Sequence, residues 1–181
     1  MPGCELIVYH CTGSSMAAGV EGERRIVDTI ARVTGQQATS TAAALLAAFE
    51  ALGARRLVFI SPATVEASRE ESAFLREAGL TVVGEHAMGL VGGQAYSEPL
   101  PSAWLETARK ASDPRADAYF LACTTTQAPE AIEDIEAAVG RPAVASNQAT
   151  LWYCLRLLGL PDHVPGLGRL MQLDIKAAVP A

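Results

Sequence analysis

Residues 6–12 read Leu-Ile-Val-Tyr-His-Cys-Thr and residues 118–124 read Ala-Tyr-Phe-Leu-Ala-Cys-Thr, and this pair of segments decides the fold. Each is an apolar run that ends in Cys-Thr, which predicts a buried strand followed by a polar turn. Small or hydroxyl residues, a helical pattern, a glycine, a short strand and a second helix follow each run. This weak internal repeat predicts two related units whose strand ends meet across a pseudo-twofold cleft.

The remaining apolar runs alternate with segments of helical periodicity. We predict strands at residues 5–10, 37–39, 56–61, 80–84, 118–122 and 143–145, with helices between them. This βα alternation favours an α/β fold in which parallel sheets are covered by helices on both faces. The helices are expected to end at Gly35, Gly53, Gly79, Gly140 and Gly159, and three are expected to be capped by Ser40, Thr64 and Ser146. Residues 92–101 are expected to form a loop.

Composition limits the classes of partner. The chain has 181 residues and a net charge of −6 without a cluster of Lys and Arg. We therefore expect neither a nucleic acid nor an anionic membrane as its partner, whereas a small anionic ligand is compatible with these charges. The first residues show neither a signal peptide nor a membrane span, so a cytoplasmic location is expected.

Four cysteines, at positions 4, 11, 123 and 154, lack the spacing of a disulfide framework and are expected to be thiols. Cys4 and Cys154 fit packing positions. Cys11 and Cys123 occupy the same place in the two units, at the carboxyl ends of strands, where open α/β sheets bind ligands. There, backbone N–H groups and hydroxyls can bind a carboxylate and lower the pKa of a thiol. One cysteine is expected to act as a thiolate and the other as a proton donor.

Other polar residues carry weaker signals. Three scattered histidines without a carboxylate at ligand spacing predict no metal site. Asn147 follows the last short strand, where its amide fits a helix cap and a ligand contact equally well. The segment 89–93 lacks the glycine order of a dinucleotide loop, and the chain contains neither a GxSxG elbow nor a Walker loop.

Several segments together resemble the maleate cis-trans isomerase and arylmalonate decarboxylase branch of the Asp/Glu racemase superfamily. They are residues 11–14, 122–124, 145–152 and 166–170. The resemblance implies two pseudo-symmetric α/β lobes with the active site between them. Residues 1–39 with 147–181 would form the first lobe and residues 40–146 the second. Because the family begins with a further strand, helix and strand, the first lobe is expected to be incomplete, and its open edge favours association of copies into a homo-oligomer.

The resemblance also implies roles for single residues. Cys11 and Cys123 match the two catalytic thiols of the isomerases and racemases, whereas decarboxylases of the branch have glycine in place of Cys11. No cofactor or metal is implied. The residues expected to bind the substrate carboxylates are Thr12, Gly13, Thr124, Thr125 and Asn147. The tyrosine that relatives place after the third strand is absent near Pro62 and Ala63, and an asparagine of the isomerases is absent at residues 92–94.

The resemblance implies a cofactor-independent isomerase of small carboxylic acids, by cis-trans isomerisation or racemisation with two cysteines. One alternative is an arylmalonate-type decarboxylase that needs only Cys123. Another is a noncatalytic, shortened protein or carboxylate-binding protein.

Overall fold

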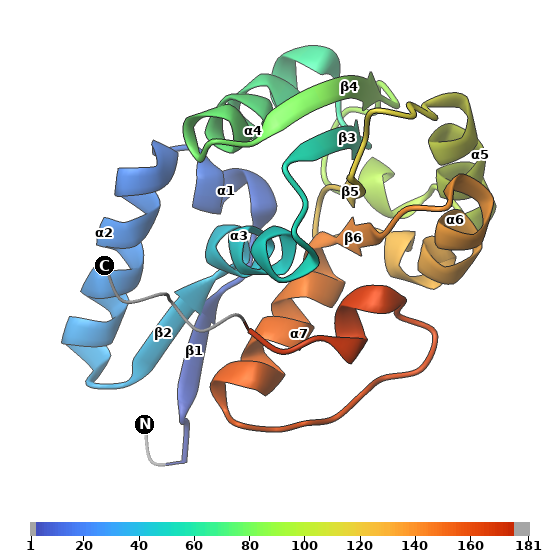
Figure 1. Ribbon diagram of the computed structural model, residues 1–181. Helices are drawn as coiled ribbons and strands as arrows, with labels where there is room; N and C mark the ends of the chain where they lie inside the picture. Colours follow the sequence, from blue (N-terminus) through green and yellow to red (C-terminus); the bar gives the residue numbers. More distant parts are fainter. Residues whose placement is uncertain (1–2, 176–181) are drawn as a thin grey trace.

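A computed structural model describes residues 3–175 of the chain, and in this range strands and helices alternate along most of its length (Figure 1). The strands are β1 (Leu6–Tyr9), β2 (Gln37–Ser40), β3 (Arg56–Ser61), β4 (Thr81–Ala87), β5 (Ala118–Leu121) and β6 (Ala143–Ala145). The helices are α1 (Thr12–Met16), α2 (Gly19–Thr34), α3 (Thr41–Leu52), α4 (Val65–Glu77), α5 (Pro101–Lys110), α6 (Ile132–Val139) and α7 (Ser146–Leu157). Short 3₁₀ turns lie at Ala95–Ser97, Ala128–Ala131 and Arg169–Gln172. All six strands predicted from the sequence are present.

A four-stranded parallel sheet, in the order β4-β3-β5-β6, forms the centre of the fold. Its two inner strands are buried on both faces. Leu57 and Phe59 of β3 pack into one core cluster, whereas Val58 and Ile60 of the same strand pack into a second. Side chains of α3, α4 and α7 complete the first cluster and those of α5 and α6 the second. A parallel sheet with helices on both faces is what these continuous apolar runs predict.

The internal repeat is visible in the strand pairing. In the first unit β1 pairs in parallel with β2, and in the second β5 pairs in parallel with β6. In both units the first strand is followed by a cysteine and helical segments, and the second strand leads directly into a helix, α3 or α7. The predicted α/β fold with two parallel sheets is thus confirmed. The exact division into lobes, 1–39 with 147–181 and 40–146, stays a prediction.

Helix ends follow the sequence signals with one exception. Ser40 and Thr64 cap α3 and α4 by accepting hydrogen bonds from the N–H groups of Ala43 and Ala67. The five glycines expected at helix ends all have positive φ values. The prediction for Ser146 was wrong, because α7 begins at Ser146 itself and its side chain contacts another segment. The segment 92–101, expected to be only a loop, contains the short turn at residues 95–97.

Between residues 3 and 175, no helix combines the length and apolar character that a membrane crossing requires.

Candidate active site

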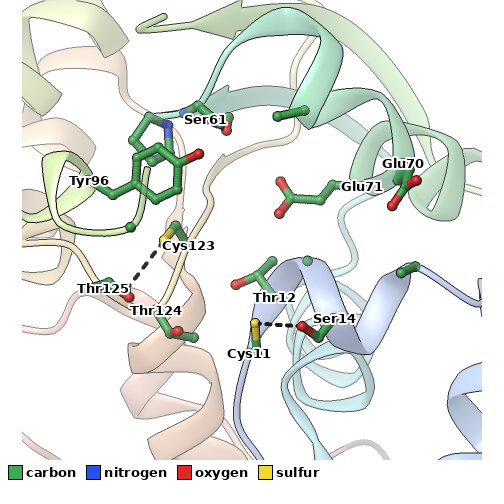
Figure 2. Close-up of a pocket in the computed structure, with 16 residues that line it drawn as sticks. Cys11, Thr12, Ser14, Ser61, Glu70, Glu71, Tyr96, Cys123, Thr124 and Thr125 are labelled. Carbon is green, nitrogen blue, oxygen red and sulfur yellow. Dashed lines mark hydrogen bonds between the residues drawn. The ribbon is translucent and has the colours of Figure 1, made fainter. Parts of the chain in front are cut away.

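A cavity of about 490 Å³ lies where strand ends of the two units meet (Figure 2). Its walls come from four regions: the start of α1, the turn after β3 with α4, the loop that contains residues 93–96, and the turn after β5. The lining includes Cys11, Thr12, Gly13, Cys123, Thr124 and Thr125. The structure therefore brings six of the seven residues proposed from the sequence into one cavity.

Cys11 lies at the point where β1 leads into α1. Its backbone is extended, with φ −163° and ψ 124°, and its thiol donates a hydrogen bond to the hydroxyl of Ser14 at 3.2 Å. The first N–H groups of a helix lack partners within the helix and favour a negative charge close to them. A thiolate at Cys11 would lie beside these groups, and the Ser14 hydroxyl would then donate to it.

Cys123 occupies the corresponding place after β5. Its φ of +79° makes it the one non-glycine residue between positions 3 and 175 with positive φ. This conformation costs about 1 kcal/mol or more for an L-residue and is typical of functional turns. Burial is the largest cause that raises the pKa of its thiol, and hydrogen bonds from Thr125 only partly offset it. The backbone N–H of Thr125 lies 3.5 Å from the sulfur. Cys123 therefore stays protonated at neutral pH and is suited to donate a proton.

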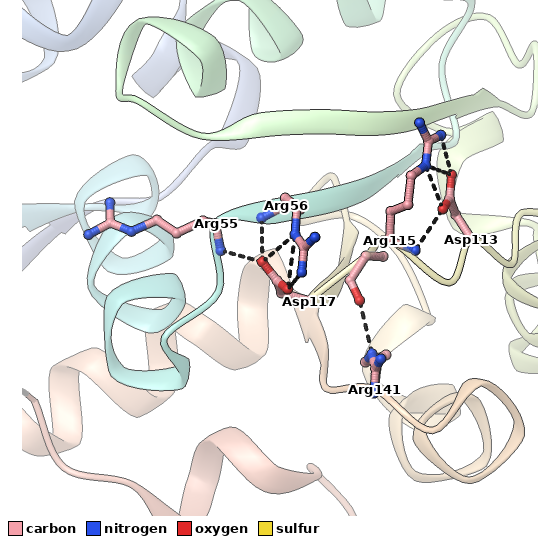
Figure 3. A network of polar contacts seen from close by, with 7 residues as sticks. Arg55, Arg56, Asp113, Arg115, Asp117 and Arg141 are labelled. Atoms are coloured by element: carbon pink, nitrogen blue, oxygen red, sulfur yellow. Dashed lines mark hydrogen bonds and ion pairs between the residues drawn. The ribbon is translucent and has the colours of Figure 1, made fainter.

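The position of Cys123 depends on the start of its strand. Asp117, just before β5, accepts hydrogen bonds from the backbone N–H groups of Arg55 and Arg56, at 3.0 and 2.8 Å, and pairs with the Arg56 guanidinium at 2.7 Å (Figure 3). This guanidinium holds the pKa of Asp117 well below its usual range. The contacts align the beginning of β3 with the beginning of β5. Further along the two strands, Ile60 of β3 is paired with Leu121 of β5. Both strands therefore end at the same wall of the cavity.

The Thr12 hydroxyl is used within the protein. It donates a hydrogen bond to the Ser146 hydroxyl at 2.8 Å, and both residues are buried. This bond joins the start of α1 to the start of α7. Because a carboxylate needs a donor and the Thr12 hydroxyl proton is directed to Ser146, Thr12 can donate to a ligand only through its backbone N–H.

Asn147 is the sequence-proposed residue that does not line the cavity. Its side-chain N–H donates to the Thr124 carbonyl at 3.3 Å, so it supports the turn that carries Cys123 and Thr124. Its position as the second residue of α7 also excludes the role of a cap. The Asn147 side-chain oxygen is buried and has no hydrogen-bond partner within residues 3–175. A direct contact between Asn147 and a ligand stays a prediction.

The structure adds cavity residues that the sequence reasoning missed, above all Glu71 and Tyr96. Glu71 follows Ser68 by three positions and precedes Leu75 by four, and both of these residues are buried. Helical spacing therefore placed Glu71 on an inward face of α4 and could have identified it. Tyr96 comes from the loop segment, and no local pattern predicts that its phenol points into this cavity, as Figure 2 shows.

The cavity carries acidic groups without a basic counterpart. Among its sixteen lining residues, all within the described range, Glu70 and Glu71 are acidic and none is Lys, Arg or His. Burial, and next the negative charge of Glu70, raise the pKa of Glu71 to about 7. No group of three His, Cys, Asp or Glu side chains within residues 3–175 is arranged to hold a metal ion. Chemistry by side chains in this cavity therefore rests on thiols, carboxyls and hydroxyls.

Comparison with known proteins agrees with this arrangement. The chain is 26% identical to an arylmalonate decarboxylase from Bordetella bronchiseptica over 171 residues, 93% of this chain and 71% of the relative. It is 28% identical to a maleate isomerase from Nocardia farcinica over 177 residues, 94% of this chain and 70% of the relative.

A solved structure of Nocardia farcinica maleate cis-trans isomerase, in which a cysteine is replaced by serine, contains a covalently bound succinylcysteine intermediate. It superposes on this chain with a TM-score of 0.88 and 25% identity, covering 93% of this chain and 71% of the other. The model of the arylmalonate decarboxylase family matches residues 1–171. With this match over nearly its whole length, the chain belongs to the arylmalonate decarboxylase family.

Proposed function

We propose that the protein is a cofactor-independent isomerase of small carboxylic acids that converts a maleate-type cis acid into its trans isomer. The observation that carries the proposal is the position of two free thiols, Cys11 and Cys123, on the wall of one cavity. Relatives named maleate isomerase support it, as does the succinylcysteine intermediate in the structure of one of them.

The reaction needs one thiolate and one protonated thiol, and we assign these roles to Cys11 and Cys123. The Cys11 thiolate adds to one carbon of the double bond, and the π electrons move toward the carbon that carries the other carboxylate. The Cys123 thiol gives this carbon a proton, which leaves a carbon–carbon single bond that rotates. The Cys123 thiolate then removes the proton, the carbon–sulfur bond breaks, and the trans acid and the Cys11 thiolate are released.

Backbone donors are proposed to bind the carboxylate groups. The N–H groups at Thr12 and Gly13 lie beside Cys11, and the turn of Thr124 and Thr125 lies beside Cys123. Donors fixed in a cavity stabilise the negative charge that develops during the addition step without having to reorganise.

Racemisation by the same thiols, as an acid and a base on opposite faces of one carbon, is a variant of this chemistry. Because it depends on reduced thiols, we further propose a cytoplasmic location.

Decarboxylation is the second candidate, favoured by the family model and by 26% identity to an arylmalonate decarboxylase. In that reaction the substrate loses CO2 and Cys123 protonates the resulting enediolate. Cys11 would have no required part, and this difference separates the two candidates.

The test is incubation of the protein with maleate, arylmalonates and simple chiral acids, followed by NMR. We expect maleate to be converted to fumarate, with a loss of about a hundredfold or more in both Cys11→Ser and Cys123→Ser. Cys154→Ser is the matched control, because Cys154 is a free thiol on α7 outside the cavity lining. Full turnover of every active substrate by Cys11→Ser would exclude the two-thiol mechanism. Release of CO2 from a disubstituted malonate without Cys11 would support the decarboxylase, and turnover of no acid would support a binding protein.

A further inference from the structure

Glu71 is a cavity residue that the proposed two-thiol reaction does not use. It extends from α4 into the cavity and faces the start of α1 (Figure 2). A Cβ atom built on Gly13 would lie 3.5 Å from the Glu71 Oε1 atom, so the carboxyl directly faces the backbone beside Cys11. A ligand held at that backbone would therefore lie next to the Glu71 carboxyl.

The elements around Glu71 offer it no cation. The residues of α1 are uncharged, the strand-end turns contribute the thiols of Cys11 and Cys123, and α4 itself contributes Glu70. On β4, the Glu85 carboxylate accepts hydrogen bonds from the Ser72 hydroxyl and the Arg76 guanidinium, so the charge of Arg76 is directed to Glu85. At the junction with α2, the carboxyl of Glu77 accepts a hydrogen bond from the N–H of Val20. None of the ion pairs found within residues 3–175 includes Glu71.

We propose that Glu71 is a specificity-determining residue that binds one carboxylate of a dicarboxylate ligand as a neutral carboxylic acid, with its O–H donating to the ligand. This inference rests on the proposed function and adds to it that binding of the dicarboxylate takes up a proton. The reason is that an ionised Glu71 only accepts hydrogen bonds and would repel the ligand, whereas the protonated form supplies a donor in a cavity without a basic side chain.

The effect of pH on affinity follows from the protonation of Glu71 in the protein without ligand. Burial and Glu70 raise the pKa of Glu71 to about 7, so the residue is mostly protonated at pH 6 and mostly ionised at pH 8. Below pH 7 the donor is already present and affinity is constant. Above pH 7 a proton must first be bound, which weakens binding by up to a factor of ten for each pH unit. Between pH 6 and pH 8 the dissociation constant should rise about tenfold.

The experiment measures the binding of succinate, a dicarboxylate without a double bond, by titration calorimetry at pH 6 and pH 8. Each titration is repeated in two buffers of different ionisation heat, which gives the number of protons taken up. For the wild type we expect about tenfold weaker binding at pH 8 and uptake of close to one proton. Glu71→Gln keeps the size and a donor but cannot ionise, so its affinity should change less than about twofold. This variant also corrects for the titration of succinate itself.

Glu70→Gln is the matched control, because it removes the neighbouring charge from the same helix but leaves burial, the larger cause of the raised Glu71 pKa, unchanged. The dependence on pH should therefore remain and move only to lower pH. Glu71→Met tests the same loss of ionisation with a side chain of similar length, and thermal melting shows that each variant is folded. An equal dependence on pH in the wild type and Glu71→Gln, or no succinate binding by the wild type, would overturn the inference. Because binding is measured without turnover, a failure of the isomerase proposal alone would leave a Glu71-dependent proton uptake intact.

Discussion

Replacing Thr12 with valine is expected to destabilise the protein, because it removes one partner of the buried bond between α1 and α7. The Thr12 and Ser146 hydroxyl oxygens are 2.8 Å apart, and the two residues are 2% and 0% exposed. Valine has nearly the same shape as threonine, so packing changes little while the Ser146 hydroxyl is left without its donor. An unpaired buried polar group costs about 1–3 kcal/mol, and we expect this decrease in the free energy of unfolding.

The double variant Thr12→Val with Ser146→Ala separates this cost from a general loss of packing. When both hydroxyls are removed, no polar group stays unpaired, so the double variant should lose about 1–2 kcal/mol less than the sum of the single variants. Urea unfolding followed by tryptophan fluorescence measures these differences. Thr34→Val is the control, because Thr34 is exposed at the end of α2 and should change stability by less than about 0.5 kcal/mol.

Additive effects of the two substitutions, within about 0.5 kcal/mol, would refute the reasoning. They would show that the Thr12–Ser146 hydrogen bond does not couple α1 to α7. The Thr12 hydroxyl would then be available to a ligand, contrary to the geometry of the cavity.

Three further predictions concern other parts of the protein. Because burial raises the pKa of the Cys123 thiol, the alkaline fall of kcat should begin only above the ordinary thiol range; an alkaline decline that already begins below pH 8 in the rate profile would contradict this. Phe120→Ala removes a fully buried ring that packs against Phe49 and Phe59, and should lower the free energy of unfolding in urea by about 3–5 kcal/mol; a much smaller decrease would contradict this packing role. Because the pKa of Asp117 is lowered in the folded protein, its ionised carboxylate stabilises the fold above about pH 4, and this stabilisation is lost as the pH falls. The melting temperature of Asp117→Asn should therefore depend less on pH between 5 and 2 than that of the wild type.

The positions of the two cysteines were predictable because their signals are local. An apolar run of strand length that ends in a polar turn specifies a strand end, and the repetition of Cys-Thr marked Cys11 and Cys123 as equivalent. The parallel sheet then brings such ends to one edge. The prediction for Ser146 failed for the opposite reason, because its hydroxyl accepts a hydrogen bond from Thr12, which is distant in the sequence, and does not cap its own helix.

Side chains brought to the cavity by packing show where local patterns stop being informative. Helical spacing places Glu71 on an inward face of α4, but it is the contact of α4 with α1 that buries its carboxyl at the cavity. Tyr96 is placed by the course of a loop, for which no periodicity exists. The sequence by itself determined the alternation of strands and helices, the family and the two thiols, since each of these signals is contained in short segments that can be recognised without knowing how they pack. Tertiary structure alone decided the burial that raises the pKa of Cys123, the internal use of the Thr12 hydroxyl and the acidic wall of the cavity, since burial and pairing arise only when distant segments pack together.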